Sequence, residues 1–413
     1  MNKIGFVSTR IAGTDGVTLE TYKWYQVLER NGYDCYFFAG ELDTPSERSF
    51  LEPKAHFEDP EIQEIHSACF GTTTRKKSLS AKIQELKDYL KLRLYEFCRK
   101  FNIELLIPEN ALAIPMNIPL GLALTELIAE TGMPTVAHHH DFSWERRRFL
   151  INAVQDYLQW AFPPNLQFVC HVVINSAASR QLSYRRGISN VIVPNVFDFA
   201  SPPPPAPNSK SLREELGFED GDIFVLQPTR IVPRKWIERA VELIDLMKLK
   251  RPQLVVSHES GDEGDLYAKR VSEYAQRLGV EVVCIGDKVG SVHTFQARCD
   301  KKYTMDDAYQ NADLVTYPSG YEGFGNAFLE AIYFRKPIVV NRYSIFVEDI
   351  EPCGFKVISF ESFVTQEIVD RIKLFMEPEN LKHMADINYK LGKSYFSYEV
   401  LEKKLIPLIE SFR

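Results

Sequence analysis

The sequence lacks the cysteine pattern of a disulfide framework or a zinc finger. Its seven cysteines are odd in number and scattered, and no two form a Cys-x-x-Cys pair. This usage excludes a regular disulfide scaffold and favours free, buried thiols in a reducing compartment. The seven are Cys35, Cys69, Cys98, Cys170, Cys284, Cys299 and Cys353.

Long apolar runs and an excess of positive charge are also missing. No stretch is long enough to cross a bilayer, and the opening residues MNKIGFVSTR pass directly into a strand-like run, so we expect no signal peptide. The net charge of −7 at pH 7 argues against a nucleic-acid partner. We therefore expect a cytoplasmic protein.

The fingerprint of dinucleotide binding is absent as well. Residues 8–20, STRIAGTDGVTLE, do not fit Gly-x-Gly-x-x-Gly, and their glycines follow the strand too late for a tight phosphate turn. A nicotinamide-dependent dehydrogenase is therefore not expected. The backbone N–H of Gly16 remains a candidate contact for a diphosphate.

Short apolar runs alternate with amphipathic helical segments along most of the chain. With 413 residues, 45% of them hydrophobic, the chain predicts two domains. The alternation of strand and helix predicts parallel sheets covered by helices. We expect the α/β class, with two doubly wound Rossmann-like domains facing a central cleft, because ligands of such sheets bind beyond the carboxyl ends of the strands.

A break in composition sets the domain boundary. The stretch 201–210, SPPPPAPNSK, cannot continue a helix or a central strand and predicts a stiff linker. We therefore predict one domain over 1–200 and a second over 211–395. A final helix, about 396–413, is expected to pack back on the first domain.

The stretch YPSGYEGFGNAFLEA, residues 317–331, joins a loop to an apolar helix. Gly323 and Gly325 allow unusual backbone angles and close approach to a ligand, and a helix start offers unpaired N–H groups to an anion. Glu322 and Glu330 then suit hydroxyl groups on either side of a phosphate. The alternative, left open here, is that Glu322 caps the helix and Glu330 is solvated.

Two cations follow a strand that ends near residue 228. In QPTRIVPRKWIERA, residues 227–240, Arg230 and Lys235 flank a short loop before a helix. If both point toward the ligand, they neutralise a diphosphate. As an isolated pattern they are equally compatible with surface charges.

Three histidines and an aspartate end another strand, in PTVAHHHDFSWERRRF, residues 134–149. Because strand side chains alternate between faces, His138 and His140 are expected on one side. A metal site formed by His138, His140 and Asp141 is an alternative that we do not favour, and no metal is expected. Arg146 to Arg148 form either a solvated helix face or part of an anionic acceptor site.

Together these residues resemble the signature of retaining glycosyltransferase family four, which has the GT-B fold. The resemblance rests on the Glu-x7-Glu pattern with Gly-Phe-Gly between, and on the pair Arg230 and Lys235. VIVPNVFDF at 191–199, VCIGD at 283–287 and GTDGVTLE at 13–20 are also similar to family segments. The resemblance covers nearly the whole chain and is strongest from 227 to 340. Phe197 and Arg335 stand where glycine is more usual, and we expect Arg335 to be tolerated at a helix end.

The resemblance implies that the N-terminal domain over 1–200 is the acceptor side and that the domain over 211–395 binds the nucleotide sugar. Glu322 would hold hydroxyls of the donor sugar, and Glu330 would bond the ribose. Arg230 and Lys235 would stabilise the departing nucleoside diphosphate without a metal ion. The remaining donor-binding candidates are Gly16, Gly286, Gly323, Phe324, Gly325 and Asn326.

The family also places a histidine at the end of the strand that carries HHH, near the donor sugar and the acceptor. Either His139 or His140 fits that place, and the sequence does not choose between them. Asp141, Trp144 and Arg146 would then lie on the acceptor side. Retention of configuration is expected, with a leaving phosphate oxygen taking the proton of the acceptor.

A basic amphipathic segment spans residues 75–101. Its apolar stripe suits an anionic membrane surface, but packing on the protein's own sheet is the more usual arrangement, and we favour it here. The stripe comprises Ile83, Leu86, Leu90, Leu94, Phe97 and Phe101.

We therefore predict a hexosyltransferase that moves glucose or mannose from UDP-glucose or GDP-mannose to a small polar acceptor. That acceptor is either neutral or anionic. The alternatives are a lipid-linked or polysaccharide acceptor, a nucleotide-sugar epimerase or phosphorylase, and a non-catalytic nucleotide-sugar sensor. The nucleotide, the sugar, the acceptor and the oligomeric state do not follow from the sequence.

Overall fold

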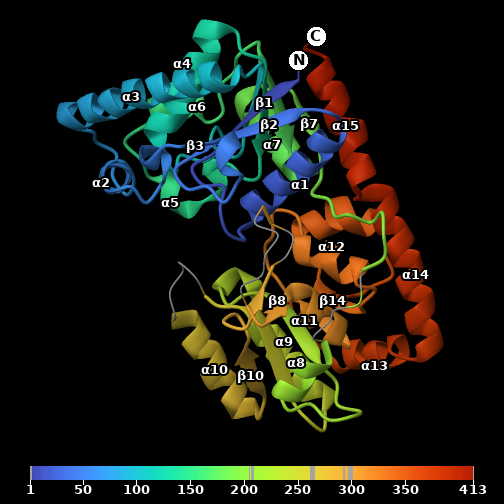
Figure 1. The fold of residues 1–413 in the computed structure, drawn as a ribbon. Helices are drawn as coiled ribbons and strands as arrows, with labels where there is room; N and C mark the ends of the chain where they lie inside the picture. The colour runs from blue at the N-terminus through green and yellow to red at the C-terminus, as the bar shows by residue number, and fades with distance from the viewer. Residues whose placement is uncertain are drawn as a thin grey trace. The chain divides into compact units, whose positions relative to one another are not determined.

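The computed structural model describes residues 2–203, 205, 209–260, 266–291, 294–295 and 301–412. Cys299 and part of the predicted linker at 201–210 lie outside these residues. The chain forms two compact units (Figure 1). Unit 1 consists of Met1–Pro194, His293–Gln296 and Leu401–Arg413, and unit 2 of Asn195–Val292 and Ala297–Val400.

Unit 1 is built on a sheet of seven parallel strands in the order β3-β2-β1-β4-β5-β6-β7. Its central strands are rich in Val, Ile, Leu and Phe and are buried, as expected when helices cover both faces of a parallel sheet. The strands are β1 (Lys3–Val7), β2 (Asp34–Ala39), β3 (Ser49–Leu51), β4 (Leu105–Pro108), β5 (Thr135–His139), β6 (Val169–Val173) and β7 (Asn190–Ile192).

Local signals in the sequence begin and end the helices of unit 1. Asp15 caps the start of α1 and Asn175 that of α7, while Gly132 and Gly187 end α4 and α7 in the left-handed conformation. The helices are α1 (Gly16–Arg30), α2 (Pro60–Cys69), α3 (Lys77–Phe101), α4 (Ile118–Thr131), α5 (Arg147–Leu150), α6 (Gln155–Ala161) and α7 (Ser176–Arg186).

The apolar stripe of α3 faces the core of unit 1. All six stripe residues are buried, and α3 lies beside α4 (Figure 1). The cations on its other faces pair with carboxylates of the same unit, for example Lys91 with Glu126 and Glu130 at 2.8 Å. The expectation that the stripe packs on the protein itself is confirmed.

Unit 2 repeats the architecture with a sheet of six parallel strands in the order β10-β9-β8-β13-β14-β15. These are β8 (Val225–Arg230), β9 (Gln253–His258), β10 (Glu281–Cys284), β13 (Leu314–Tyr317), β14 (Ile338–Asn341) and β15 (Ile358–Phe360); β11 (Val289–Gly290) and β12 (Tyr303–Thr304) form a separate pair. The helices are α8 (Ser209–Glu215), α9 (Ile237–Met247), α10 (Leu266–Leu278), α11 (Met305–Asn311), α12 (Asn326–Tyr333), α13 (Gln366–Phe375), α14 (Pro378–Tyr395) and α15 (Tyr398–Glu410).

The predicted α/β class with two doubly wound units is confirmed. Among the described residues, no helix is both long and apolar enough to span a membrane, and the six described cysteines are free thiols. The last helix, α15, begins in unit 2, and its residues from Leu401 onward belong to unit 1.

Both sheets have a point at which the direction of winding reverses. In unit 1 this switch lies between β1 and β4, which are neighbours in the sheet, with Ile4 paired to Leu105 and Val7 to Pro108, although β2 and β3 lie between them in the sequence. In unit 2 it lies between β8 and β13. Loops that leave such strands at their carboxyl ends diverge and leave room for a ligand. The candidate site residues gather at these two places.

Candidate active site

In unit 2, Glu322 is held by two cations at the switch between β8 and β13. Lys235, in the short helix Pro233–Lys235 after β8, donates to Glu322 Oε1. Arg234 Nη1 donates to Glu322 Oε2 at 3.2 Å. Both Glu322 and Lys235 are buried, so the fold places these two predicted site residues in direct contact.

Positive charge exceeds negative charge in this group. Burial lowers the pKa of Lys235, which Glu322 raises again and the neighbouring Arg234 and Arg230 lower further. Burial alone raises the pKa of Glu322, but the charges of Lys235 and Arg234 bring it below its ordinary value. Lys235 and Arg234 therefore contact one ionised carboxylate, and with Arg230 near Lys235 the group has more positive than negative charge to offer an anionic ligand.

The glycine-rich loop after β13 adopts a backbone that requires glycine. Gly325 has φ of +147°, and a Cβ atom there would lie 2.6 Å from the hydroxyl oxygen of Tyr343. That hydroxyl donates to the carbonyl oxygen of Phe324 at 2.7 Å, and the Phe324 ring is buried against Phe396. These contacts of Tyr343 and Phe396 hold the loop in place, and α12 begins directly after it at Asn326.

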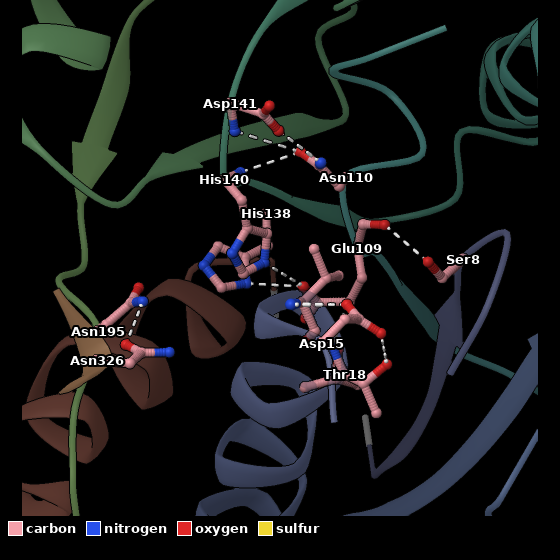
Figure 2. A network of polar contacts seen from close by, with 12 residues as sticks. Ser8, Asp15, Thr18, Glu109, Asn110, His138, His140, Asp141, Asn195 and Asn326 are labelled. Atoms are coloured by element: carbon pink, nitrogen blue, oxygen red, sulfur yellow. Dashed lines mark hydrogen bonds and ion pairs between the residues drawn. The ribbon is translucent and has the colours of Figure 1, made fainter. Parts of the chain in front are cut away.

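Two further predicted donor residues on α12 are oriented by neighbouring side chains. Asn326 Oδ1 accepts from Asn195 Nδ2 at 2.8 Å (Figure 2). Glu330 Oε2 accepts from the hydroxyl of Tyr309 at 2.6 Å, and the Tyr309 ring stacks on Phe334. Glu330 is therefore held by a partner and is not simply solvated.

The predicted backbone contacts at Gly286 and Gly16 lie in different surroundings. Gly286 follows β10 and lies close to the end of β9, since a Cβ atom there would lie 3.0 Å from the backbone nitrogen of Glu259. Gly16 is the first residue of α1, and a Cβ there would meet nothing within 4 Å. Asp15 already accepts from the N–H groups of Val17 and Thr18 at this helix start.

In unit 1, Glu109 joins two of the three consecutive histidines (Figure 2). Its Oε2 lies 2.9 Å from His138 Nδ1 and 3.1 Å from His140 Nε2. Glu109 follows β4 directly and bridges to His138 in parallel register. His139 points to the other side and shares a hydrogen bond of 2.9 Å with His171. The alternation expected for His138 and His140 is confirmed.

Burial governs the ionisation of this cluster. It raises the pKa of Glu109 to about 7, against the lowering effect of His140. It lowers the pKa of His138 to about 3 and also lowers that of His140. Glu109 is fully buried and its second oxygen, Oε1, has no hydrogen-bond partner. Of the three histidines, His138 and His139 are buried, and His140 is partly exposed.

The predicted acceptor-side residues do not all come together. Asp141 accepts from Asn110 Nδ2 at 2.8 Å and from Arg146 Nε, so these two predicted residues are in contact. The Trp144 ring instead stacks on Phe142 and lies beneath the guanidinium of Arg185, next to an apolar cluster of unit 1. Trp144 therefore packs apart from the Glu109 cluster.

Sequence reasoning missed three residues of these sites. Arg234, rather than Arg230, contacts Glu322. Glu109 binds the histidines, and Tyr309 orients Glu330. A signal existed for Glu109, because a Glu-Asn pair directly follows an apolar strand and the carboxyl ends of neighbouring parallel strands share an edge. Nothing in the local sequence marked Tyr309.

The two departures from the family pattern are accommodated. Phe197 packs on Tyr333, with ring centroids 4.7 Å apart. Arg335 follows α12 with φ of +59°, a conformation that favours glycine. Its guanidinium pairs with Asp386 and lies 4.4 Å from the ring centroid of Tyr389. These contacts offset the backbone strain at the helix end.

The chain is similar to known glycosyltransferases. The family described as Glycosyl transferases group 1 matches residues 208–391. A mannosylglucosylglycerate synthase of Thermotoga maritima is 33% identical, with 97% of this chain and 98% of that protein covered. The protein of the same name from Petrotoga mobilis is 28% identical, with 97% and 100% covered.

Solved structures share the fold at low sequence identity. HepE of Anabaena in complex with UDP-glucose matches with a TM-score of 0.64 at 15% identity, over 100% of both chains. A glycosyltransferase from Rickettsia africae matches with a TM-score of 0.68 at 13% identity, over 99% of this chain and 98% of that one. At these identities the likeness concerns the fold.

Proposed function

Because this chain belongs to glycosyltransferase family four, with the GT-B fold, we propose that it transfers mannose from a nucleotide-diphosphate donor to a small anionic glycoside. The acceptor of this proposal is glucosylglycerate, and the product is mannosylglucosylglycerate. The proposal takes its sugar and acceptor from the two similar synthases, which align with almost the whole chain.

The ion-paired Glu322 carries the proposal on the donor side. A carboxylate that stays ionised at neutral pH accepts hydrogen bonds from sugar hydroxyls, and the surplus charge of Arg230, Arg234 and Lys235 suits the diphosphate. Negative charge grows on the leaving diphosphate in the transition state, where fixed cations stabilise it most. These side chains supply that charge without a metal ion at the diphosphate.

The remaining proposed donor contacts are backbone N–H groups and two side chains of α12. The N–H groups of Gly323, Phe324 and Gly325, at the start of α12, face the donor, with Gly16 and Gly286 as further backbone contacts. Glu330, held by Tyr309, bonds the ribose, and Asn326 is held in place by Asn195. GDP-mannose is the first donor to test, and UDP-glucose is the second.

Unit 1 supplies the acceptor side in this proposal. Of the two candidate histidines, His139 is buried and bonded to His171, whereas His140 has exposed surface. His140 is therefore the one that we assign to the reacting sugars. Arg146 to Arg148 are exposed and suit the glycerate carboxylate, with Asp141 orienting Arg146. Because Glu322 is engaged by two cations, we assign retention to front-face attack rather than to a covalent intermediate.

The test is an assay of the full-length protein with GDP-mannose and glucosylglycerate. We expect the product to keep the anomeric configuration of the donor, as read by NMR. Glu322→Gln is expected to lower kcat by about 10²–10³-fold, the range typical for loss of one preorganised electrostatic contact. GDP binding, measured by calorimetry, should persist in this variant.

The matched control is Glu379→Gln, an exposed glutamate near the start of α14, which should leave kcat unchanged. Conversion of the donor without an acceptor would favour an epimerase. Nucleotide binding without any turnover would favour a sensor. Equal activity of Glu322→Gln and the wild type would overturn the assigned role of Glu322.

A further inference from the structure

Glu109, His138 and His140 form a set of metal-ligand atoms in unit 1. One nitrogen of each histidine and a carboxylate oxygen of Glu109 all lie within 4.8 Å of one another. Oε2 of Glu109 is 2.9 Å and 3.1 Å from the two nitrogens. Ligands of a tetrahedral zinc ion at about 2.1 Å are roughly 3.4 Å apart. The two oxygen–nitrogen distances are therefore within about half an ångström of the separation that a zinc ion needs.

The cluster lacks a positive charge. Within the described part of the chain, Glu109 pairs with no lysine or arginine, and its side-chain partners are His138 and His140. The buried Glu20 nearby forms an ion pair with Lys23 at 2.5 Å and so supplies no cation to Glu109. A buried carboxylate without a cation is costly, so either a proton or a metal ion must supply the missing charge.

The unpartnered Oε1 of Glu109 distinguishes these two solutions. It is buried and accepts no hydrogen bond. A proton shared between Oε2 and a histidine leaves Oε1 without a partner, whereas an ion chelated by both oxygens satisfies it. From this geometry we propose that Glu109, His138 and His140 bind one divalent transition-metal ion, of which zinc is the best match.

The surroundings of the three ligands hold them in place. The Trp24 ring stacks on His138 with centroids 4.0 Å apart, and Asn110 Oδ1 accepts from the backbone N–H of His140 at 3.1 Å (Figure 2). Such support of ligand orientation is typical of metal sites. Two imidazoles and one carboxylate favour zinc, cobalt or iron over magnesium and calcium. The His140 side chain, 9% exposed, provides the edge at which an ion enters and a water completes its coordination.

This proposal does not rest on the proposed function. Metal-free transfer was expected for the diphosphate, whose candidate cations Arg230 and Lys235 lie in unit 2, whereas the cluster belongs to unit 1. Of the three metal ligands, His140 also has a role in the proposed function. It also differs from the set His138, His140 and Asp141 considered from the sequence. The Asp141 carboxylate is bonded to Asn110 and Arg146 instead, and Glu109 takes its place.

Metal binding by the chelator-stripped, full-length protein tests the site directly. Titration with Zn²⁺ in a calorimeter should show one ion per chain, and Co²⁺ should produce visible absorption bands of a mixed nitrogen and oxygen site. Glu109→Gln and His140→Ala should each weaken Zn²⁺ binding by more than about 100-fold, since each loses a direct ligand. Asp141→Asn and His383→Ala, the latter exposed on α14, should bind as the wild type does.

Either of two results would overturn the proposal. One is the absence of a stoichiometric Zn²⁺ site in the wild type, which would assign the missing charge to a proton. The other is unchanged binding in both Glu109→Gln and His140→Ala. If Glu109→Gln does not fold, as judged by circular dichroism, His140→Ala at the exposed edge decides the question. None of these measurements depends on transferase activity.

Discussion

At the scale of single residues, Glu322 shows how neighbours set the state of a functional group. Burial opposes its ionisation, yet Lys235 and Arg234 lower its pKa below the ordinary value. The carboxylate is therefore ionised at neutral pH, and it accepts rather than donates hydrogen bonds. Lys235 Nζ also lies 5.5 Å from the ring centroid of Tyr317.

The lowered pKa of Glu322 predicts a pH-dependent contribution to stability. Above its ordinary value of 4.5, Glu322 is charged in both the folded and the unfolded chain, and the ion pairs contribute fully. As the pH falls below that value, the unfolded chain takes up the proton first, and the contribution is lost as the pH passes the lower folded pKa.

We therefore expect Glu322→Gln to lower the free energy of unfolding by about 3 kcal/mol at pH 7, because it leaves Lys235 buried without its anion. The difference from the wild type should shrink between pH 4.5 and pH 3, as measured by the unfolding temperature at each pH. Glu379→Gln should show no such trend. A difference that stays constant down to pH 3 would refute the ion-pair explanation.

At the scale of elements, α3 shows that spacing decides which side of a helix is buried. Its apolar residues recur at three- and four-residue intervals, and these positions face the core. Leu90 is fully buried and belongs to the central cluster of unit 1, whereas Leu92, two residues further, is 62% exposed. The same residue type thus has opposite roles on one helix.

Leu90→Ala and Leu92→Ala form a matched pair. We expect Leu90→Ala to lower the free energy of unfolding by about 2–5 kcal/mol, because it leaves a cavity in a packed core. Leu92→Ala should change it by less than about 0.5 kcal/mol. Urea denaturation followed by circular dichroism measures both. Equal effects would mean that the stripe does not face the core, and would reopen the membrane-surface interpretation.

At the scale of the whole molecule, each unit has its own sheet, its own core and its own switch point. The cluster around Val225, Ile244 and Leu254 belongs to unit 2, and that around Phe38, Leu94 and Leu124 to unit 1. Polar residues gather beyond the carboxyl ends of both sheets. Apart from Gly16, the proposed donor residues belong to unit 2, whereas the proposed metal ligands belong to unit 1.

This separation predicts where a nucleotide changes backbone protection. With GDP at a hundredfold excess over its dissociation constant, binding stabilises the folded state by about 2.7 kcal/mol. Hydrogen exchange measured by mass spectrometry should slow most in residues 230–235 and 319–326. Peptides that contain Glu109 and His138 should change less. The largest protection in those peptides instead would contradict the assignment of the nucleotide to unit 2.

The sequence by itself determined the class of the fold and the order of its elements. Alternating apolar runs and amphipathic segments specify strands and helices locally, and Gly325 is required by its own backbone angle. Glu322 and Glu330 were also recognisable, because they flank one glycine-rich loop, and Lys235 because it follows Arg230 in the loop after another strand. The opposite directions of His138 and His139 followed from the strand period.

Only the tertiary structure decided which side chains meet. Glu109 precedes His138 by 29 residues, and the two come together because β4 and β5 are neighbours in the sheet. Arg234, and not Arg230, contacts Glu322, because the short helix after β8 places Arg234 beside that carboxylate. The physical reason is that strand order and loop conformation arise from packing of the whole unit, whereas residue spacing encodes only the local period.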